Sequence, residues 1–261
     1  MAVTSTPALE LRGLSKSFGS VAALERMDLA AYRGEVHAIV GDNGAGKSTA
    51  IKIVTGIHKG DGGEIVIDGV PMDVIHGASE ALERGIAVVY QDLALVECLD
   101  ISTNMALGNL PKRWGIVLDR RRMDREAAKV LTDLNVRVGD VKTPVGLLSG
   151  GQRQVVAIAR AVRMDKDIML LDEPTAALGV QETAHVGRMI DELRLSGKAI
   201  ICISHDQDFV FRHADRITVL RLGNTVGTRV VSETTRDEIV GLITGAIAPD
   251  ASARNSLKEA S

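Results

Sequence analysis

Aromatic residues are scarce in this chain: they make up 2% of its 261 residues, whereas hydrophobic residues as a whole make up 45%. The core must therefore consist mainly of aliphatic side chains, which is typical of a parallel sheet covered by helices. Cysteine is scarce as well, and Cys98 and Cys202 form no CxxC pair and have no histidine cluster around them. This argues against a structural zinc site and favours a reducing compartment.

Long apolar runs and an excess of one charge are also missing. No segment approaches the roughly 18–20 apolar residues that span a bilayer, and the first residues, MAVTSTPALELRG, lack the features of a signal peptide. The net charge is −3, whereas a general nucleic-acid binder is usually strongly basic. We therefore expect a cytoplasmic protein that binds no nucleic acid and that acts at a membrane only through a partner.

Apolar segments of strand length alternate with longer helical patterns along most of the chain. The expected strands are EVHAIVG, EIVIDG, GIAVVYQ, DIMLLDEP, KAIICIS and RITVLRLG. The expected helices begin at Lys47 and span about Arg122 to Leu134, Gln152 to Arg163 and Gln181 to Leu195. Continuous Ile, Val and Leu strands between helices predict an α/β fold with a mostly parallel central sheet.

Three segments depart from this alternation. LELRGLSKSFG and GEIVIDGVPM look like hairpins, which predicts an N-terminal antiparallel β subdomain. The region of about 92–165 lacks strong strands and predicts a helical insertion. The polar end, APDASARNSLKEAS, predicts a disordered tail. We therefore expect one domain over residues 1–246 and a tail over 247–261.

The segment GDNGAGKST follows an expected strand and fits the phosphate-loop pattern G-x-x-x-x-G-K-[ST]. Its glycines permit positive φ values and close backbone approach, so successive N–H groups can surround phosphate oxygens. Lys47 can reach the β- and γ-phosphates, and the Ser48 hydroxyl can ligate Mg²⁺. The expected phosphate-binding residues are Gly41, Asp42, Asn43, Gly44, Ala45, Gly46, Lys47, Ser48 and Thr49.

Two carboxylates, Asp172 and Glu173, end the apolar strand DIMLLDEP. The carboxyl ends of strands are where open α/β sheets bind their ligands. Adjacent carboxylates repel each other unless a cation neutralises them, so Asp172 is a candidate Mg²⁺ ligand and Glu173 a candidate base for an attacking water. A kinase would use such a base on a substrate hydroxyl, and this pair alone does not separate the two reactions.

The stretch LSGGQRQ, from Leu148 to Gln154, places a serine and two glycines directly before an expected helix. Free N–H groups at a helix start bind anions, although an ordinary N-cap would also explain Ser149. Together with the phosphate loop and LLDEPTAAL, this stretch resembles the ATPase subunits of ABC transporters. The resemblance covers roughly residues 8 to 245 and implies a P-loop NTPase fold that binds ATP and Mg²⁺.

The resemblance implies a head-to-tail pair, in which ATP on the phosphate loop of one copy is closed over by LSGGQ of the second copy. It implies that Phe18 stacks on adenine, that Gln91 contacts Mg²⁺ and the attacking water, and that His205 lies near the γ-phosphate. The implied contacts from the second copy are Ser149, Gly150, Gly151 and Gln152. The implied catalytic residues are Lys47, Gln91, Glu173 and His205. The implied Mg²⁺ ligands are Ser48, Gln91 and Asp172.

Gly179 stands where the family usually has an aspartate, in a loop that meets the second copy. This variant, with GEVHAIVGDNGAGKST and LALVECLDISTNMALG, resembles the ATPases of bacterial monosaccharide importers of the ribose, xylose and fructose type. That subgroup implies a homodimer at the cytoplasmic face of the membrane, an integral membrane permease and, indirectly, a periplasmic or extracellular sugar-binding protein. The alternative is an ABC-type ATPase with another transport substrate or with a soluble, non-transport function.

Two further segments bear on partners. Arg120, Arg121 and Arg122 begin an expected helix, where a solvated face is the ordinary interpretation and contact with an acidic partner surface or lipid headgroups is the alternative. The segment from about Asp92 to Leu110 is expected to receive a helix of the membrane partner, since LALV and MALG offer apolar anchors.

Overall fold

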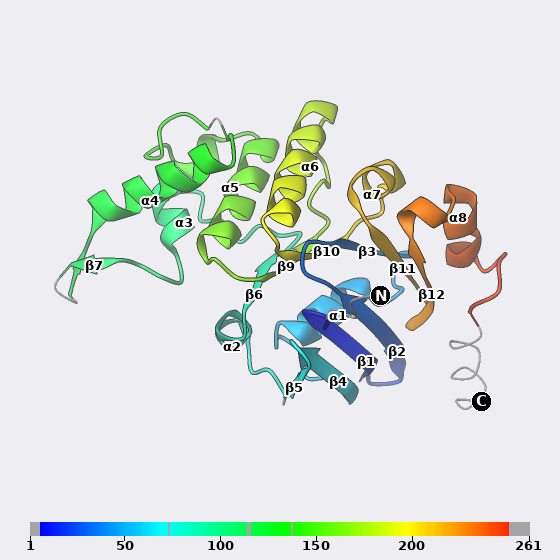
Figure 1. Cartoon of the computed structure of the whole chain (residues 1–261). Coiled ribbons are helices and arrows are strands. Elements are labelled where there is room, and N and C mark those ends of the chain that lie inside the picture. The colour runs from blue at the N-terminus through cyan, green and yellow to red at the C-terminus, as the bar shows by residue number, and fades with distance from the viewer. Residues whose placement is uncertain (1–5, 73, 114–115, 137, 251–261) are drawn as a thin grey trace.

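The computed structural model describes residues 6–72, 74–113, 116–136 and 138–250 (Figure 1). A ten-stranded sheet forms its centre, with the strand order β5–β4–β1–β2–β12–β11–β3–β10–β9–β6. The parallel strands are β3 (Val36–Val40), β6 (Ile86–Val89), β9 (Ile168–Asp172), β10 (Ala199–Ile203) and β11 (Arg216–Arg221). This confirms the predicted α/β fold with a mostly parallel sheet.

The N-terminal strands pair in the antiparallel sense, as predicted. They are β1 (Leu9–Phe18), β2 (Val21–Ala31), β4 (Gly62–Ile67) and β5 (Val70–Met72). They join the rest of the sheet through β12 (Asn224–Val230), which pairs with β2 at the single position Asn224–Arg26. The two parts therefore form one sheet and not two separate ones.

Helices cover both faces of the parallel strands (Figure 1). They are α1 (Lys47–Val54), α2 (Ala78–Glu83), α6 (Val180–Leu195), α7 (Gln207–His213) and α8 (Arg236–Thr244). The expected helical insertion contains α3 (Ile101–Ala106), α4 (Arg120–Asp133) and α5 (Gly150–Arg163). It also contains a ribbon of two short strands, β7 (Lys112–Arg113) and β8 (Val117–Leu118). None of the helices in the described part of the chain has the length and apolarity that crossing a membrane requires.

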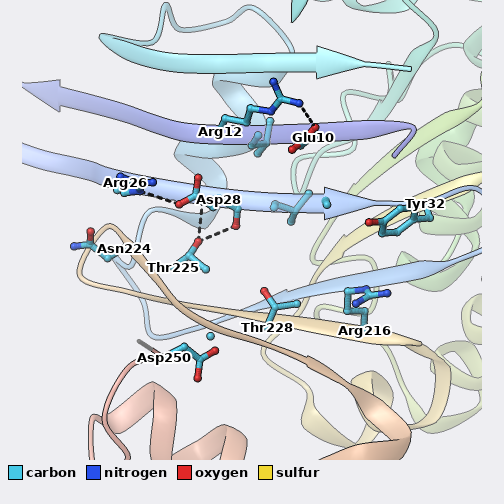
Figure 2. A pocket seen from close by; sticks show the side chains of 14 residues that line it. Glu10, Arg12, Arg26, Asp28, Tyr32, Arg216, Asn224, Thr225, Thr228 and Asp250 are labelled. Carbon is cyan, nitrogen blue, oxygen red and sulfur yellow. Dashed lines mark hydrogen bonds and ion pairs between the residues drawn. The ribbon is translucent and has the colours of Figure 1, made fainter. Parts of the chain in front are cut away.

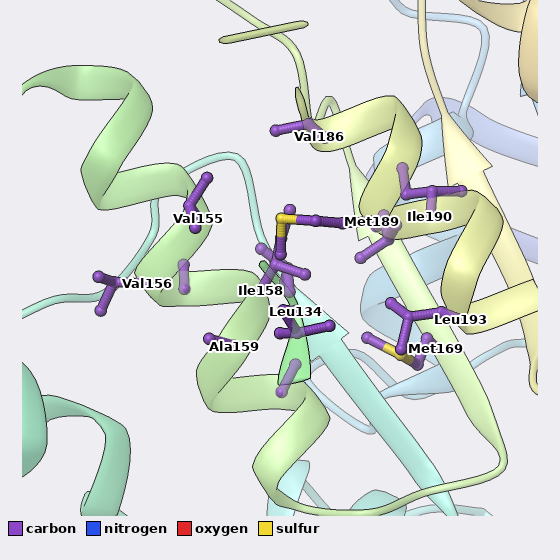
Figure 3. Close-up of a cluster of buried hydrophobic side chains, with 14 of the residues drawn as sticks. Leu134, Val155, Val156, Ile158, Ala159, Met169, Val186, Met189, Ile190 and Leu193 are labelled. Carbon is purple, nitrogen blue, oxygen red and sulfur yellow. The ribbon is translucent and has the colours of Figure 1, made fainter. Parts of the chain in front are cut away.

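The core is built almost entirely from aliphatic side chains, as the composition predicts. Alternate residues of β9 point to opposite faces: Met169 and Leu171 pack beneath α5 and α6, whereas Ile168 and Leu170 belong to the cluster around α1. Figure 3 shows side chains of α5, α6 and β9 converging in the first of these clusters. Because both faces are buried, the carboxyl ends of the strands are the part of the sheet left open for a site.

The described chain stays attached to the sheet up to residue 250. The backbone N–H of Ile247 donates to the carbonyl of Gly241 at 2.9 Å, and Asp250 forms an ion pair with Arg229 at 2.8 Å. The remainder of the expected tail, residues 251–261, lies outside the described residues.

Candidate functional site

The phosphate loop connects β3 to α1 in a shape that its own packing requires. A Cβ on Gly41 would lie 2.1 Å from the Leu220 carbonyl oxygen, and a Cβ on Gly46 would lie 2.4 Å from the Ala23 carbonyl oxygen. Gly46 also has a φ of 105°, which favours glycine. Between them, Gly44 faces open space. The loop is therefore pressed against β2 and β11 on one side and accessible on the other.

Lys47 holds this loop together from inside. Its side chain is largely buried, and Nζ donates hydrogen bonds to the carbonyls of Gly41 at 2.7 Å and Asp42 at 2.9 Å. Burial lowers the pKa of Lys47, and the nearby charges of Glu173, Asp42 and Asp172 oppose that shift. The ammonium group thus lies at the centre of the loop, where it can exchange carbonyl partners for phosphate oxygens.

Asp172 ends β9 with a buried oxygen that lacks a partner. The residue is 6% exposed, and Oδ1 has no hydrogen-bond partner among the described residues. Burial raises the pKa of Asp172, while a hydrogen bond from Ser48 lowers it. A carboxylate oxygen with free lone pairs beside a hydroxyl is the oxygen donor set that Mg²⁺ prefers. These two residues therefore fit the expected ion, which would take its other ligands from phosphate and water.

The neutral variant Asp172→Asn should stabilise the ligand-free chain at about pH 7, because the amide keeps the size of the side chain but removes the cost of burying a charge. Because burial raises the folded pKa above the unfolded one, the penalty exists above the folded pKa and vanishes below the unfolded pKa of about 3.9. Thermal unfolding at about pH 7 and about pH 3 tests this. A variant that is less stable at neutral pH, or equally stabilised at both values, would contradict the prediction.

Glu173 is held beside His205 by the pairing of β9 with β10. Ile203 is the register partner of Asp172, and the N–H of Glu173 donates to the Ile203 carbonyl at 2.9 Å. This places Glu173 Oε2 2.8 Å from Nδ1 of His205. The Glu173 side chain is 13% exposed and that of His205 is 71% exposed. A largely buried carboxylate therefore contacts an exposed imidazole at the carboxyl ends of the strands.

Gln91 and Phe18 are exposed near the ends of their strands and take no part in the core. Gln91 follows β6, which is the neighbour of β9 in the sheet, and its side chain is exposed. Phe18 ends β1 and is 45% exposed. Its ring meets the edge of His58 at a centroid distance of 5.1 Å, and Lys16 Nζ lies 5.4 Å from its centroid. Both expected ligand contacts are thus accessible to solvent.

Ser149 begins α5 at a place separate from the phosphate loop. It is the N-cap, since its Oγ accepts from the N–H of Gln152 at 3.2 Å while Gln152 Oε1 accepts from the N–H of Ser149 at 3.0 Å. A hollow of about 350 Å³ beside it is lined by Val136, Val138, Ser149, Gly151, Gln152, Val155, Gln181, Glu182 and His185. No residue of the phosphate loop lines that hollow. The structure therefore brings Lys47, Ser48, Asp172, Glu173 and His205 together and leaves Ser149 apart.

Glu182 is a contact that sequence reasoning missed. Its Cγ occupies the space of a Cβ on Gly151, at 2.4 Å, and its Oε2 lies 2.6 Å from where a Cβ on Gly179 would be. The carboxylate side chain thus lies across the first turns of both α5 and α6. The sequence did show a glutamate in the first turn of an expected helix, after the glycine that caps it. That pattern indicates a helix start, but it does not reveal that the side chain contacts α5.

Another hollow, of about 510 Å³, lies between β1, β2, β11 and β12 (Figure 2). Its charged groups are paired: Arg12 with Glu10 at 2.7 Å and Arg26 with Asp28 at 2.9 Å. None of the residues that the sequence predicts for the site lines it.

A glycine-rich loop between a parallel strand and a helix, with a buried aspartate beside it at the end of β9, defines a nucleotide-binding protein of the phosphate-loop class. Residues 24–176 match the family model described as ABC transporter, which is more than half of the chain. The chain therefore belongs to the ABC transporter family and corresponds to its ATP-binding cassette. This confirms the resemblance that the LSGGQRQ stretch carries.

Two curated relatives are import ATP-binding proteins for sugars. The chain is 41% identical to the putative ribose/galactose/methyl galactoside import ATP-binding protein 2 of Burkholderia lata, over 91% of this chain and 45% of that protein. It is 42% identical to the fructose import ATP-binding protein FrcA of Rhizobium meliloti, over 93% of this chain and 96% of that protein. The chain thus spans about half the length of the first relative and nearly all of the second.

A solved structure with the same fold is the dimeric, post-hydrolysis state of the ATP-binding cassette MJ0796 bound to ADP and Pi. The TM-score is 0.74 at 26% identity, and the match covers 85% of this chain and 98% of that chain. This likeness supports the assignment of the fold over most of the chain.

Proposed function

We propose that the chain is the ATP-hydrolysing subunit of a membrane importer for a monosaccharide, and that it acts as a dimer with two composite ATP sites. The observation that carries the proposal is the separation of two half-sites on one chain. The phosphate loop, Asp172, Glu173 and His205 gather at one edge of the sheet, while Ser149 heads α5 without contact to them. A second copy would bring its own Ser149 to this nucleotide.

Gly150 supports the composite arrangement. Glycine has a lower helix propensity than alanine, so helix formation alone gives no reason for it. A Cβ on Gly150 would have open space around it, so packing within this chain does not require glycine there. By contrast, a Cβ on the neighbouring Gly151 would lie 2.4 Å from Cγ of Glu182 and would displace that side chain. The need for close approach at Gly150 therefore comes from a group outside the chain, and a phosphate at the N-terminus of α5 meets that description.

Each expected site residue has a role in this proposal. Lys47 and the loop N–H groups bind the phosphates, and Phe18 stacks on adenine. Ser48, Asp172 and Gln91 would hold Mg²⁺, which neutralises charge on the phosphate oxygens when bound. Glu173 takes the proton of the attacking water, and His205 orients Glu173 and the γ-phosphate. Ser149, Gly150, Gly151 and Gln152 of the second copy contact the γ-phosphate.

The import role is supported by the names of the sugar-import relatives and by the match to nearly the whole of FrcA. A permease in the membrane would hold the cassette at the cytoplasmic face, with its coupling segment on the residues from about Asp92 to Leu110. An extracytoplasmic binding protein would deliver the sugar. The cassette itself contributes ATP-driven closure, and the sugar is selected by those other chains.

Sugar uptake in cells tests the import role. A chromosomal Lys47→Ala substitution should abolish uptake of one labelled monosaccharide among ribose, galactose and fructose, because a loop without its ammonium does not hold ATP. The exposed variant Lys142→Gln serves as the matched control and should leave uptake unchanged. If uptake of all three sugars survives in the Lys47→Ala strain, the result would favour the alternative, which is an ABC ATPase with another substrate or with no transport role.

A further inference from the structure

A short ribbon projects from the helical region between α3 and α4. β7 and β8 pair Lys112 with Leu118 and Arg113 with Val117, and all four residues are exposed. Figure 1 shows this ribbon at the outer edge of the helical region, far from the sheet. A two-stranded ribbon with exposed strand residues has little stability of its own. Packing among the described residues therefore does not explain why it projects.

Aliphatic side chains gather on this ribbon and beside it. Ile116 is 86% exposed, Val117 57%, Leu110 41% and Leu118 39%. Single exposed aliphatic residues are ordinary, whereas several on one projection mark an interaction site. The ribbon thus offers an apolar tip to something outside the chain.

Positive charge surrounds the apolar tip. Residues 110–129 contain seven Lys and Arg against three Asp and Glu, a net charge of +4 in a chain whose total is −3. Arg120, Arg121 and Arg122 occupy the first turn of α4, which contains no acidic residue. Positive charge at that end of a helix is unfavourable by about 0.3–1 kcal/mol. Arg120 pairs with Asp100 at 3.3 Å and Arg122 with Glu126 at 2.6 Å, whereas Arg121 has no ion-pair partner among the described residues. Helix stability therefore does not explain Arg121, and an anionic partner does.

A hollow of about 540 Å³ lies between the ribbon and α4, and four of the five charged residues that line it are basic. It is lined by Asn109, Leu110, Pro111, Lys112, Arg122, Glu126, Lys129, Val130 and Arg163. Glu126 is paired with both Arg122, at 2.6 Å, and Arg163, at 2.8 Å, so its charge is already neutralised. Lys129 pairs with Asp133 at 2.7 Å, so Lys112 is the lining residue that remains to attract an anionic group.

We propose that the surface formed by Leu110, Lys112 and residues 116–122 binds an anionic phospholipid bilayer. Ile116, Val117 and Leu118 would enter the headgroup region, while the arginines at the start of α4 contact lipid phosphates. Apolar side chains combined with basic ones are how interfacial segments bind membranes. A protein partner of the usual interface size would need a broader and more complementary surface than a ribbon of two-residue strands. The inference does not depend on the nucleotide site.

Sedimentation with protein-free vesicles tests this surface directly. The chain should bind vesicles of equal parts phosphatidylglycerol and phosphatidylcholine about tenfold or more strongly than vesicles of phosphatidylcholine alone. The preference should disappear as ionic strength rises toward about 1 M. The double variant Lys112→Gln/Arg121→Gln and the variant Ile116→Ser should each weaken binding about tenfold, since one removes charge and the other apolar area.

Matched controls come from elsewhere on the surface. Lys142→Gln removes an exposed charge of the same helical region, and Leu195→Ser removes an aliphatic side chain that is 78% exposed at the end of α6. Both variants should bind vesicles as the parent does. Glu173→Gln should also bind like the parent, so a failure of the proposed ATPase function can be told apart from a failure of membrane binding. Circular dichroism checks the folding of every variant.

Three outcomes would overturn the proposal: absence of binding to anionic vesicles, equal binding to both vesicle types, or ribbon variants that behave like the controls. In the first case an acidic protein surface becomes the partner.

Discussion

A glutamine in place of Glu173 is expected to lower ATP turnover by about 10²–10⁴-fold, the contribution of a positioned general base, while ATP binding is retained. The amide preserves the size of the side chain and a contact with His205, which now lies 2.8 Å from the carboxylate, but it does not take a proton from water. Because bound ATP is not consumed, the variant should accumulate as a dimer. Phosphate release measures turnover, and light scattering with and without ATP measures the mass.

The chain offers a matched control for this experiment. Asp191 pairs with His213, Nδ1 to Oδ2 at 3.0 Å, in the same kind of carboxylate–imidazole contact between α6 and α7. Asp191→Asn should leave turnover unchanged, because that pair lies outside the proposed site. A Glu173→Gln variant that remains a monomer at saturating ATP would contradict the composite site, and one that loses ATP binding would contradict the assignment of a base.

Ser149→Arg is expected to reduce ATP turnover about 100-fold or more while leaving nucleotide binding to the phosphate loop nearly intact. Removing one donor to a developing anion costs about 10²–10³ in rate, and the bulk of arginine adds a steric block at the open face of Gly150. The loss of an N-cap alone costs only about 1 kcal/mol of stability. A fluorescent ATP analogue gives the affinity, and phosphate release gives the rate.

Thr235→Arg is the control for capping, because Thr235 caps α8 in the same way, accepting from the N–H of Glu238 at 3.3 Å. It should keep full turnover. A sharper version mixes Ser149→Arg with Lys47→Ala. In a mixed dimer one of the two sites has an intact loop and an intact Ser149, so roughly a quarter of the parent turnover should return if copies exchange freely. Equal loss of binding and turnover in Ser149→Arg, or no recovery on mixing, would count against a site shared between copies.

The parallel sheet and the phosphate loop could be predicted because each is encoded locally. Strands buried on both faces are continuous aliphatic runs, and the loop pattern carries its own glycines and lysine. The order of Asp172 and Glu173 directly after such a strand was enough to place them at the open edge. His205 was placed only through the family resemblance. Its contact with Glu173 follows from the pairing of β9 with β10, which the sequence does not state.

Features that depend on distant residues could not be predicted. The need for glycine at position 41 comes from Leu220 on β11, and the contact of Glu182 with Gly151 joins two helices that are separate in the sequence. The start of α5 was also predicted two residues late, at Gln152 instead of Gly150. The preceding side chain, Ser149, caps the helix, and the cap rather than the apolar pattern sets the first residue.

The backbone of Glu173 has a φ of 52°, in the left-handed region that favours glycine. A residue with a Cβ is disfavoured there by about 1–2 kcal/mol, so the fold alone would be better served by glycine at this position. Selection for thermal stability alone would therefore favour glycine at position 173, and the protein would lose the proposed base. Stability and the proposed chemistry make opposite demands on this residue, so a stabilised variant should keep Glu173.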